Sequence, residues 1–263
     1  KDMNRILEYI ENMFYKIRFS LITLKPHAEY INVPDGTRTY IDGRNVTFGN
    51  LTWKRGYRKL YEKGLDPMFR TDRPWEQDES PKEFITTDDT DIVLTLPAKS
   101  IRKTAYLYSN FTIKYGTVRA LVKSSNTKGA WSAFWLFGKD GTPEHDMFEH
   151  CGQWKNKLNV THHWGYDYEG IRGKKMTSQN GRYNKNFKPS EEYYLYEVEL
   201  TPYKAVYRIN GETVRVMRRG ISSGLNHILF NIAKGEYCES YMNKPLEKQA
   251  QMRVRYLEIF KIR

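Results

Sequence analysis

Three carboxylates stand close together in the middle of the chain: Glu144, Asp146 and Glu149. Residues two apart on a β-strand share a face, so Glu144 and Asp146 point the same way, whereas Glu149 would point the opposite way. A β-bulge that adds one residue, at Met147 or Phe148, would return Glu149 to the face of the other two. The spacing therefore predicts a bulged strand with one acidic face.

Such an acidic face can cleave a glycosidic bond. With the bulge, the two glutamates are effectively four positions apart, about 13 Å along the backbone at about 3.3 Å per residue. Side chains that lean together can bring the carboxyl groups to the roughly 5 to 5.5 Å of a retaining glycosidase, where one attacks and the other transfers the proton. By itself, the pattern also fits an exposed strand with solvated acids or a calcium-binding loop.

The surrounding residues resemble glycoside hydrolase family 16, whose signature is E-x-D-x-x-E on a bulged strand. Residues 131–138, WSAFWLFG, resemble the family's W-P-A-F-W-L-x-G. Residues 111–120, FTIKYGTVRA, are similar to F-x-Y-G-x-x-E-A-R. In order and spacing the resemblance covers most of residues 75–263, and the core signature is its specific part.

Carried over residue by residue, the resemblance implies that Glu144 is the nucleophile, Glu149 the general acid/base and Asp146 the carboxylate between them. The sequence departs from the family at His145, where an aliphatic residue usually packs inside. We expect His145 to be a hydrogen-bonded core residue; a direct part in proton transfer is the alternative.

The resemblance also implies an all-β fold, a concanavalin A-like jelly-roll sandwich whose concave sheet forms the glycan cleft. Segments with the alternation or apolar character of strands fit this fold, and an Asn-Gly turn joins two of them into a hairpin. They are residues 91–97, 105–113, 116–123, 157–165, 193–200, 205–211, 212–217, 227–233 and 252–262. Residues 57–82 and 166–186 are expected to be loops.

Two tryptophans precede the acidic strand. Trp131 and Trp135 are four apart and so share a face if this segment is a strand. They are candidates for a platform under the apolar faces of sugar rings, and packing in the core is the equal alternative.

Residues 157–165 are expected to form the antiparallel neighbour of the acidic strand. Leu158 and Val160 would face the core, which places His163 on the substrate side. His-Trp-Gly resembles cleft residues in several family members, so His163 and Trp164 are candidate substrate contacts.

The chain is strongly basic, with a formal net charge of +12. The basic residues are scattered and no nucleic-acid module is recognisable, so an anionic polysaccharide is favoured over nucleic acid as the partner. The loop 166–186 carries Arg172 and four other basic residues and is the best candidate for contacts with anionic sugar groups. A solvated loop is the alternative.

No cofactor is expected. A structural calcium is frequent in the family but has no readable ligand set here. Two adjacent histidines without acidic or cysteine residues at metal-ligand spacing argue against zinc, so no metal site is predicted.

The first 24 residues predict a helix with a narrow apolar seam, because its apolar side chains are spaced four and three apart. The seam consists of Met3, Leu7, Ile10, Phe14, Ile17 and Leu21. We expect the helix to lie on its own domain; the alternative is a helix that joins a homo-oligomer or larger assembly. The expected organisation is a helix over 1–25, a β connector or first edge strands over 26–56, and a catalytic jelly roll over 57–263.

Two cysteines, Cys151 and Cys238, are expected to be free thiols, with a single bridge as the alternative. The sequence has no apolar run long enough to span a membrane and no visible signal peptide, and no membrane partner is expected. The start of the chain looks trimmed, and the family resemblance favours an extracellular or secreted protein.

Together these features predict a retaining endo-acting glycoside hydrolase of a β-linked polysaccharide, favouring an anionic galactan of the carrageenan, porphyran or agar type. One alternative is a non-catalytic carbohydrate-binding jelly roll, a subunit of a larger assembly. A transglycosylase would use the same site with a sugar hydroxyl in place of water. A protein that binds nucleic acid is the most distant alternative.

Overall fold

The computed structural model describes most of the chain. The described residues are 2–22, 45–48, 51–58, 69–70, 80–88, 91–100, 104–138, 143–165, 176–221, 224–234, 238 and 244–262. Residues 26–44, the first part of the expected β connector or edge strands, lie outside them.

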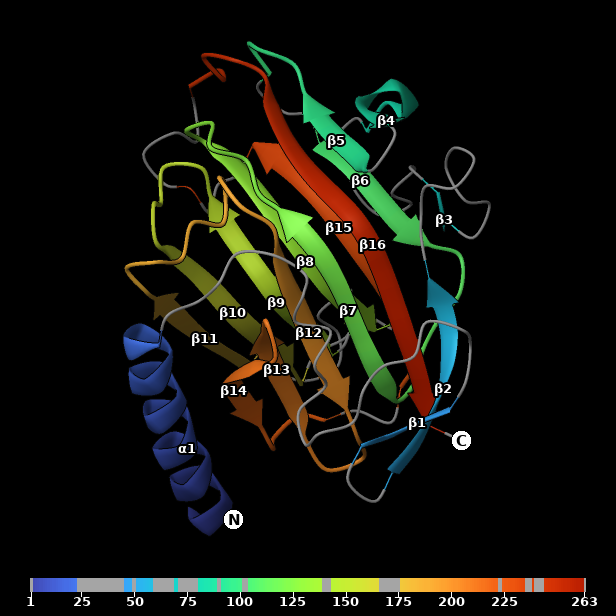
Figure 1. Ribbon diagram of the computed structural model, residues 1–263, viewed down its shortest axis with the longest axis vertical. Helices are drawn as coiled ribbons and strands as arrows, with labels where there is room; N and C mark the ends of the chain where they lie inside the picture. Colours follow the sequence, from blue (N-terminus) through green and yellow to red (C-terminus); the bar gives the residue numbers. More distant parts are fainter. Residues whose placement is uncertain are drawn as a thin grey trace.

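Two antiparallel sheets form a sandwich, which Figure 1 shows with the strands of one sheet in front of the other. The strands of the larger sheet are β1 Asn45–Phe48, β2 Leu51–Arg58, β4 Ile85–Thr87, β5 Ile92–Leu96, β7 Gly116–Lys123, β12 Tyr194–Leu200, β13 Ala205–Ile209, β14 Glu212–Met217 and β16 Ala250–Ile262. Their order is β1-β2-β16-β7-β12-β13-β14, and β5 pairs with both β16 and β4. A short 3-10 helix, η1 Lys82–Phe84, precedes β4.

The second sheet carries the acidic strand. Its strands are β3 Phe69–Arg70, β6 Thr104–Ser109, β8 Ala130–Gly138, β9 Glu144–Cys151, β10 Lys157–Trp164, β11 Met176–Tyr183 and β15 Asn226–Lys234. Their order is β11-β10-β9-β8-β15-β6-β3, which places β9 between β8 and β10.

The core lies between the sheets because alternate residues of each strand point inward. Val118 and Val122 of β7 face it from one side, and Phe134 of β8 and Phe230 of β15 face it from the other. The rings of Phe134 and Phe230 stack with their centroids 4.4 Å apart. Burying each such side chain contributes roughly 1.5–3 kcal/mol, so this alternation is the main source of the sandwich's stability.

The fold agrees with the predicted all-β sandwich behind an N-terminal helix, and each predicted strand segment contains a strand. The predicted Asn-Gly turn is present between β13 and β14, with positive φ at Asn210 and Gly211. The prediction of a loop over residues 166–186 is wrong in its second half, where β11 pairs with β10 along its whole length. Strand β11, MTSQNGRY, is polar and lacks alternation, so its pairing with β10 overrides its weak strand propensity.

Strands β1 and β2 extend the larger sheet beyond β16, with β2 pairing along residues 258–262. In this arrangement they are edge strands of the main sheet, one of the two alternatives for residues 26–56. The division of the chain into domains stays a prediction.

Helix α1, Asp2–Leu21, lies against β14 and β11 at one side of the sandwich (Figure 1). Its polar side makes this contact. Asn12 exchanges two hydrogen bonds with the backbone of Val216, with distances of 2.7 and 3.0 Å. Glu8 is buried and pairs with Arg219 at 3.0 Å. The helix therefore lies on its own domain as expected, but the apolar seam does not face that domain.

Within the described residues, the structure contains no helix with the length and apolar character needed to cross a membrane.

Candidate active site

A bulge in β9 sets the direction of the three carboxylates. Phe148 pairs with Phe134 of β8, but Trp135, the next residue of β8, pairs with Asp146, so Met147 is the extra residue. Met147 and Phe148 both belong to the core, although adjacent residues of a regular strand face opposite ways. The predicted bulge is present, and it turns Glu149 to the face of Asp146.

Strand β10 shows that the three acids share one face. Residues directly opposite each other in an antiparallel pair lie on the same face of the sheet. Three residues two apart on β10 oppose the three acids in turn: Asn159 opposes Glu149, Thr161 opposes Asp146, and His163 opposes Glu144. These six side chains form the outer face of β9 and β10, which we call the acidic face.

Two of the carboxylates have a neighbour from β10 on the acidic face. The Thr161 hydroxyl donates a short hydrogen bond to Oε2 of Glu149, and both side chains are buried. His163 Nε2 lies 3.7 Å from Oδ2 of Asp146. The expected placement of His163 on the side of the acids is confirmed, because Leu158 and Val160 face the core.

Glu144, Asp146 and His163 could also hold a cation, because one ligand atom from each lies within 4.8 Å of the others. Calcium takes six to eight oxygen ligands, whereas this group offers two carboxylates and an imidazole. The group therefore does not fit the structural calcium that the family resemblance suggests, and no chemistry is assigned to a metal here.

Aromatic side chains flank the acidic face on the side of β8. Trp135, opposite Asp146, is nearly buried, and its Nε1 donates a 2.8 Å hydrogen bond to Oδ1 of Asn231 on β15. Its ring meets Tyr106 and Phe137 edge to face, with centroids 6.3 and 5.4 Å apart. Trp135 is thus on the side of the acids as predicted, in a packed aromatic cluster.

Trp131 lies on the same face of β8, opposite Cys151, and its side chain is partly exposed. Of the two tryptophans it has the more accessible ring. Its contact with a sugar stays a prediction.

Trp164 does not lie on the side of the acids, so the prediction that it contacts the substrate there is wrong. Trp164 is on the opposite face of β10 from His163, where it packs against the core and stacks on His162 at 5.1 Å between centroids. Gly220 makes this packing possible, since a Cβ there would lie 2.2 Å from the Trp164 ring. Because side chains alternate along β10, Trp164 faces the core when His163 faces the acids.

The described part of the basic segment 166–186 offers fewer basic side chains for contacts with anionic sugar groups than expected. Arg172 lies outside the described residues. Arg182 is fully buried between the sheets, and its Nε donates a 2.6 Å hydrogen bond to the carbonyl of Val214. Burial, followed by the charge of Arg215, lowers the pKa of Arg182 to about 9.

His145 lies behind the acids, in the core, as expected. Its Nδ1 is 2.9 Å from the Tyr207 hydroxyl and 3.0 Å from Nδ1 of His162. Burial, and then the charge of Arg215, lowers the pKa of His145 to about 3. The imidazole is therefore neutral at ordinary pH and supports the strand from inside.

The expectation of two free thiols is wrong. Cys151, the last residue of β9, and Cys238 form a disulfide with their Cα atoms 5.7 Å apart. The two residues are 87 positions apart, so no local pattern could show that the fold brings them together.

The side chains that hold the site residues in place lie outside the sequence motifs described above. Asn231 fixes the Trp135 indole, and Tyr106 packs against the same ring. A signal for Asn231 exists, since it is a lone polar residue in the apolar run 228–233. A buried polar side chain needs a partner, so such a residue is a candidate support for a site.

Comparisons with known proteins agree with this geometry. The chain is 28% identical over 110 residues to the putative xyloglucan endotransglucosylase/hydrolase protein 1 of Arabidopsis thaliana, which is 42% of this chain and 35% of that protein. It is 26% identical over 168 residues to the Crh-like protein CRH11 of Candida albicans, which is 64% of this chain and 33% of that protein. The matches thus span about a third of the length of each relative.

Among solved structures, the fold resembles the catalytic domain of an endo-1,3-β-glucanase (laminarinase) from Thermotoga petrophila, with a TM-score of 0.65 and 17% identity over 81% of this chain and 99% of that one. At this identity the likeness concerns the fold. The sequence profile of the glycosyl hydrolases family 16 matches residues 71–242, more than half of the chain, including every strand from β5 to β15. The chain therefore belongs to glycosyl hydrolase family 16.

Proposed function

We propose that the chain is a retaining, endo-acting glycoside hydrolase that cleaves a β-linked polysaccharide at the acidic face. The observation that carries the proposal is the bulge at Met147, which turns Glu149 to the face of Glu144 and Asp146. A regular strand would direct Glu149 into the core, where an unpaired carboxylate is costly. Family membership supports the same assignment.

The reaction would proceed in two displacements. In the first, protonated Glu149 gives its proton to the glycosidic oxygen while a carboxylate oxygen of Glu144 attacks the anomeric carbon. The bond to the leaving sugar breaks, and a glycosyl ester of Glu144 forms. In the second, the Glu149 carboxylate takes a proton from water, the water oxygen attacks the anomeric carbon, and Glu144 leaves as a carboxylate.

Asp146 would act between the two glutamates. It shares their face, and His163 Nε2 lies 3.7 Å from its carboxylate. A charged Asp146 beside Glu144 and a Glu149 held by Thr161 give the two glutamates different surroundings. Because their surroundings differ, one carboxyl group can act as the nucleophile and the other as the acid.

For the substrate, we place a β-glucan before an anionic galactan. The galactan expectation rests on the net charge of +12, and Arg182, one of the basic residues expected to contact it, is buried. One relative is named for xyloglucan and the laminarinase for a 1,3-β-glucan. The aromatic side chains beside the acids suit the apolar faces of pyranose rings in either polymer.

Secretion would suit such a substrate. The Cys151–Cys238 disulfide supports an oxidising location, because disulfides persist outside the reducing cytosol. Fractionation of the native producing cells, with the protein detected in the medium or cell wall, would test this part of the proposal.

The decisive experiment is reducing-end release from a panel of laminarin, mixed-linkage glucan, xyloglucan, agarose, porphyran and carrageenan. We expect new ends from at least one polymer, with the β-anomer formed first by NMR. Glu144→Gln and Glu149→Gln should each remove turnover while the unfolding midpoint stays near that of the wild type. Substantial activity in either variant would overturn the assignment.

The same panel separates the competing functions. A non-catalytic binding module would be retained on a polymer without forming new ends. A transglycosylase, which the name of the Arabidopsis relative brings into consideration, would change the length distribution of the chains with few new reducing ends. Either result would replace hydrolysis as the function.

A further inference from the structure

Helix α1 turns its polar side to the sheets and its apolar side away from them. Glu8 and Asn12 are bonded to β14 and the residues after it, and Phe19 is buried against Phe187. Nine other large apolar side chains of the helix are exposed by roughly half or more. They are Met3, Ile6, Leu7, Tyr9, Ile10, Met13, Phe14, Ile17 and Leu21. We call this surface the apolar arc.

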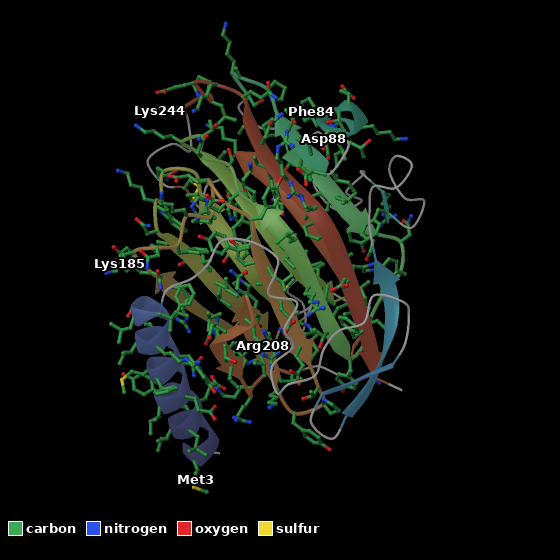
Figure 2. All side chains as sticks on the ribbon, viewed as in Figure 1. Met3, Phe84, Asp88, Lys185, Arg208 and Lys244 are labelled. Carbon is green, nitrogen blue, oxygen red and sulfur yellow. A yellow bond between two sulfur atoms is a disulfide. The ribbon has the colours of Figure 1, made fainter. Side chains whose placement is uncertain are left out.

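The apolar arc is wide. At about 100° per residue, its side chains cover about 160° of the helix circumference, and the roughly 120° from Met13 to Leu7 contains apolar residues alone. Figure 1 shows α1 at the side of the sandwich, and in Figure 2 the labelled Met3 points away from the sheets at the end of the helix. A flat surface could therefore meet the arc along the length of the helix.

A coiled coil between two copies fits the arc poorly. A two-stranded coiled coil buries a narrower seam and places charged residues beside it. Here the positions on one side of the seam are apolar, Ile6 and Met13. On the other side Glu11 and Arg18 are already ion-paired to side chains of the domain, at 3.0 and 2.9 Å. Pairing by the seam would leave Ile6 and Met13 uncovered, and the charges next to the seam, Glu11 and Arg18, are already paired within the domain.

The charges beside the apolar arc favour an anionic surface. Arg5 and Lys16 are exposed on the border next to Tyr9, and the structure gives them no ion pair with any residue that it describes. Glu8 and Glu11, in contrast, are neutralised by Arg219 and Arg218. The helix thus presents apolar side chains with a basic border, on a protein that carries +12.

We propose that α1 binds the surface of an anionic lipid bilayer. The helix would lie in the plane of the membrane, with the apolar arc at the boundary between headgroups and acyl chains and with Arg5 and Lys16 beside the lipid phosphates. The expectation of no membrane partner rested on the lack of a spanning segment, which a helix lying on the surface does not need. The apolar residues were visible in the sequence, but the side of the helix that docks was not.

The test is flotation of the full chain with vesicles. We expect it to float with vesicles of equal parts phosphatidylcholine and phosphatidylglycerol, and to bind vesicles of phosphatidylcholine alone at least tenfold more weakly. Ile10→Glu combined with Phe14→Glu should weaken binding tenfold or more, because both side chains are more than half exposed and lie in the part of the arc that contains apolar residues alone. Arg5→Glu with Lys16→Glu should weaken binding to the anionic vesicles specifically.

The matched control is Tyr203→Glu, which changes a 79% exposed side chain in the turn between β12 and β13. It should float like the wild type, and all variants should keep the wild-type unfolding midpoint. Equal flotation of the Ile10→Glu/Phe14→Glu variant and the control would overturn the proposal, as would no flotation of the wild type. Sedimentation showing a wild-type dimer that this variant dissociates would assign the arc to a second copy instead.

Discussion

His145 and His162 meet through their Nδ1 atoms, 3.0 Å apart, in the core directly behind the acidic face. Nε2 of His162 lies 3.1 Å from the carbonyl of Arg219, and a carbonyl can only accept, so Nε2 carries the proton. In the neutral ring Nδ1 of His162 is then an acceptor, and His145 must donate from its own Nδ1. This tautomer pattern joins β9 to β10 only while both rings stay neutral.

Stability should therefore fall in acid. Burial lowers the pKa of His145 to about 3 and that of His150 to about 4, and it lowers the pKa of His162 well below 6.5. Above pH 6.5 these rings are neutral in both the folded and unfolded states and contribute nothing to the pH dependence. Below it the unfolded chain takes up protons that the folded chain refuses, so the free energy of unfolding decreases, by roughly 1.4 kcal/mol per pH unit for each ring. Urea unfolding from pH 8 to 4.5 would measure this slope.

A His145→Leu variant isolates one ring of the three. Its slope between pH 6 and 4.5 should be shallower by about one proton, since leucine does not titrate in either state. An unchanged slope would contradict the assignment of the pH dependence to this pair. The variant also loses the donor to His162, so its stability at pH 8 should be lower.

The bulge can be tested by removing its extra residue. Deleting Met147 would make β9 regular and leave Asp146 and Glu149 two positions apart, so both carboxylates would still share the acidic face. We expect the deletion variant to keep measurable turnover on the substrate that the panel identifies, because only the extra residue is removed. Met147→Leu keeps the bulge and a similar volume, and it should keep activity within a few-fold.

Circular dichroism decides whether the deletion variant has folded before its activity is measured. A folded deletion variant without turnover would show that Met147 does more than set the face of Glu149. The contrasting variant lacks both Met147 and Phe148. Asp146 and Glu149 are then neighbours and face opposite ways, so a folded variant of this kind should lose turnover.

The sequence predicted features that depend on neighbouring residues and missed those that depend on distant ones. The count from Glu144 to Glu149 is enough to require a bulge. In contrast, His145 meets Tyr207, 62 positions later, and Cys151 meets Cys238, 87 positions later. The helical period marks an apolar stripe, but the side of α1 that docks is decided by groups such as Val216, which bonds to Asn12.

Removing the disulfide should lower stability without removing the fold. Cys151 and Cys238 close a loop of 87 positions, so their bond restricts the unfolded chain, and its loss should cost about 2–5 kcal/mol. Guanidinium unfolding of a Cys151→Ala/Cys238→Ala variant measures the loss. Dithiothreitol should destabilise the wild type by a similar amount and leave the variant unchanged. If the disulfide of the wild type is shown to be reduced and its stability does not change, the prediction is contradicted.

The hydroxyl of Thr161 should matter for the chemical step. It donates to Oε2 of Glu149, and Glu149 acts in the proposed mechanism only while bonds break and form. Thr161→Val removes the donor at nearly constant volume, so kcat should fall about tenfold or more, with KM little changed. Thr161→Ser restores the hydroxyl and should recover most of the rate. Valine keeps the volume of threonine but lacks the hydroxyl, whereas serine keeps the hydroxyl but is smaller. A rate that follows side-chain volume would therefore assign Thr161 to packing. A rate that follows the hydroxyl would assign it to the orientation of Glu149.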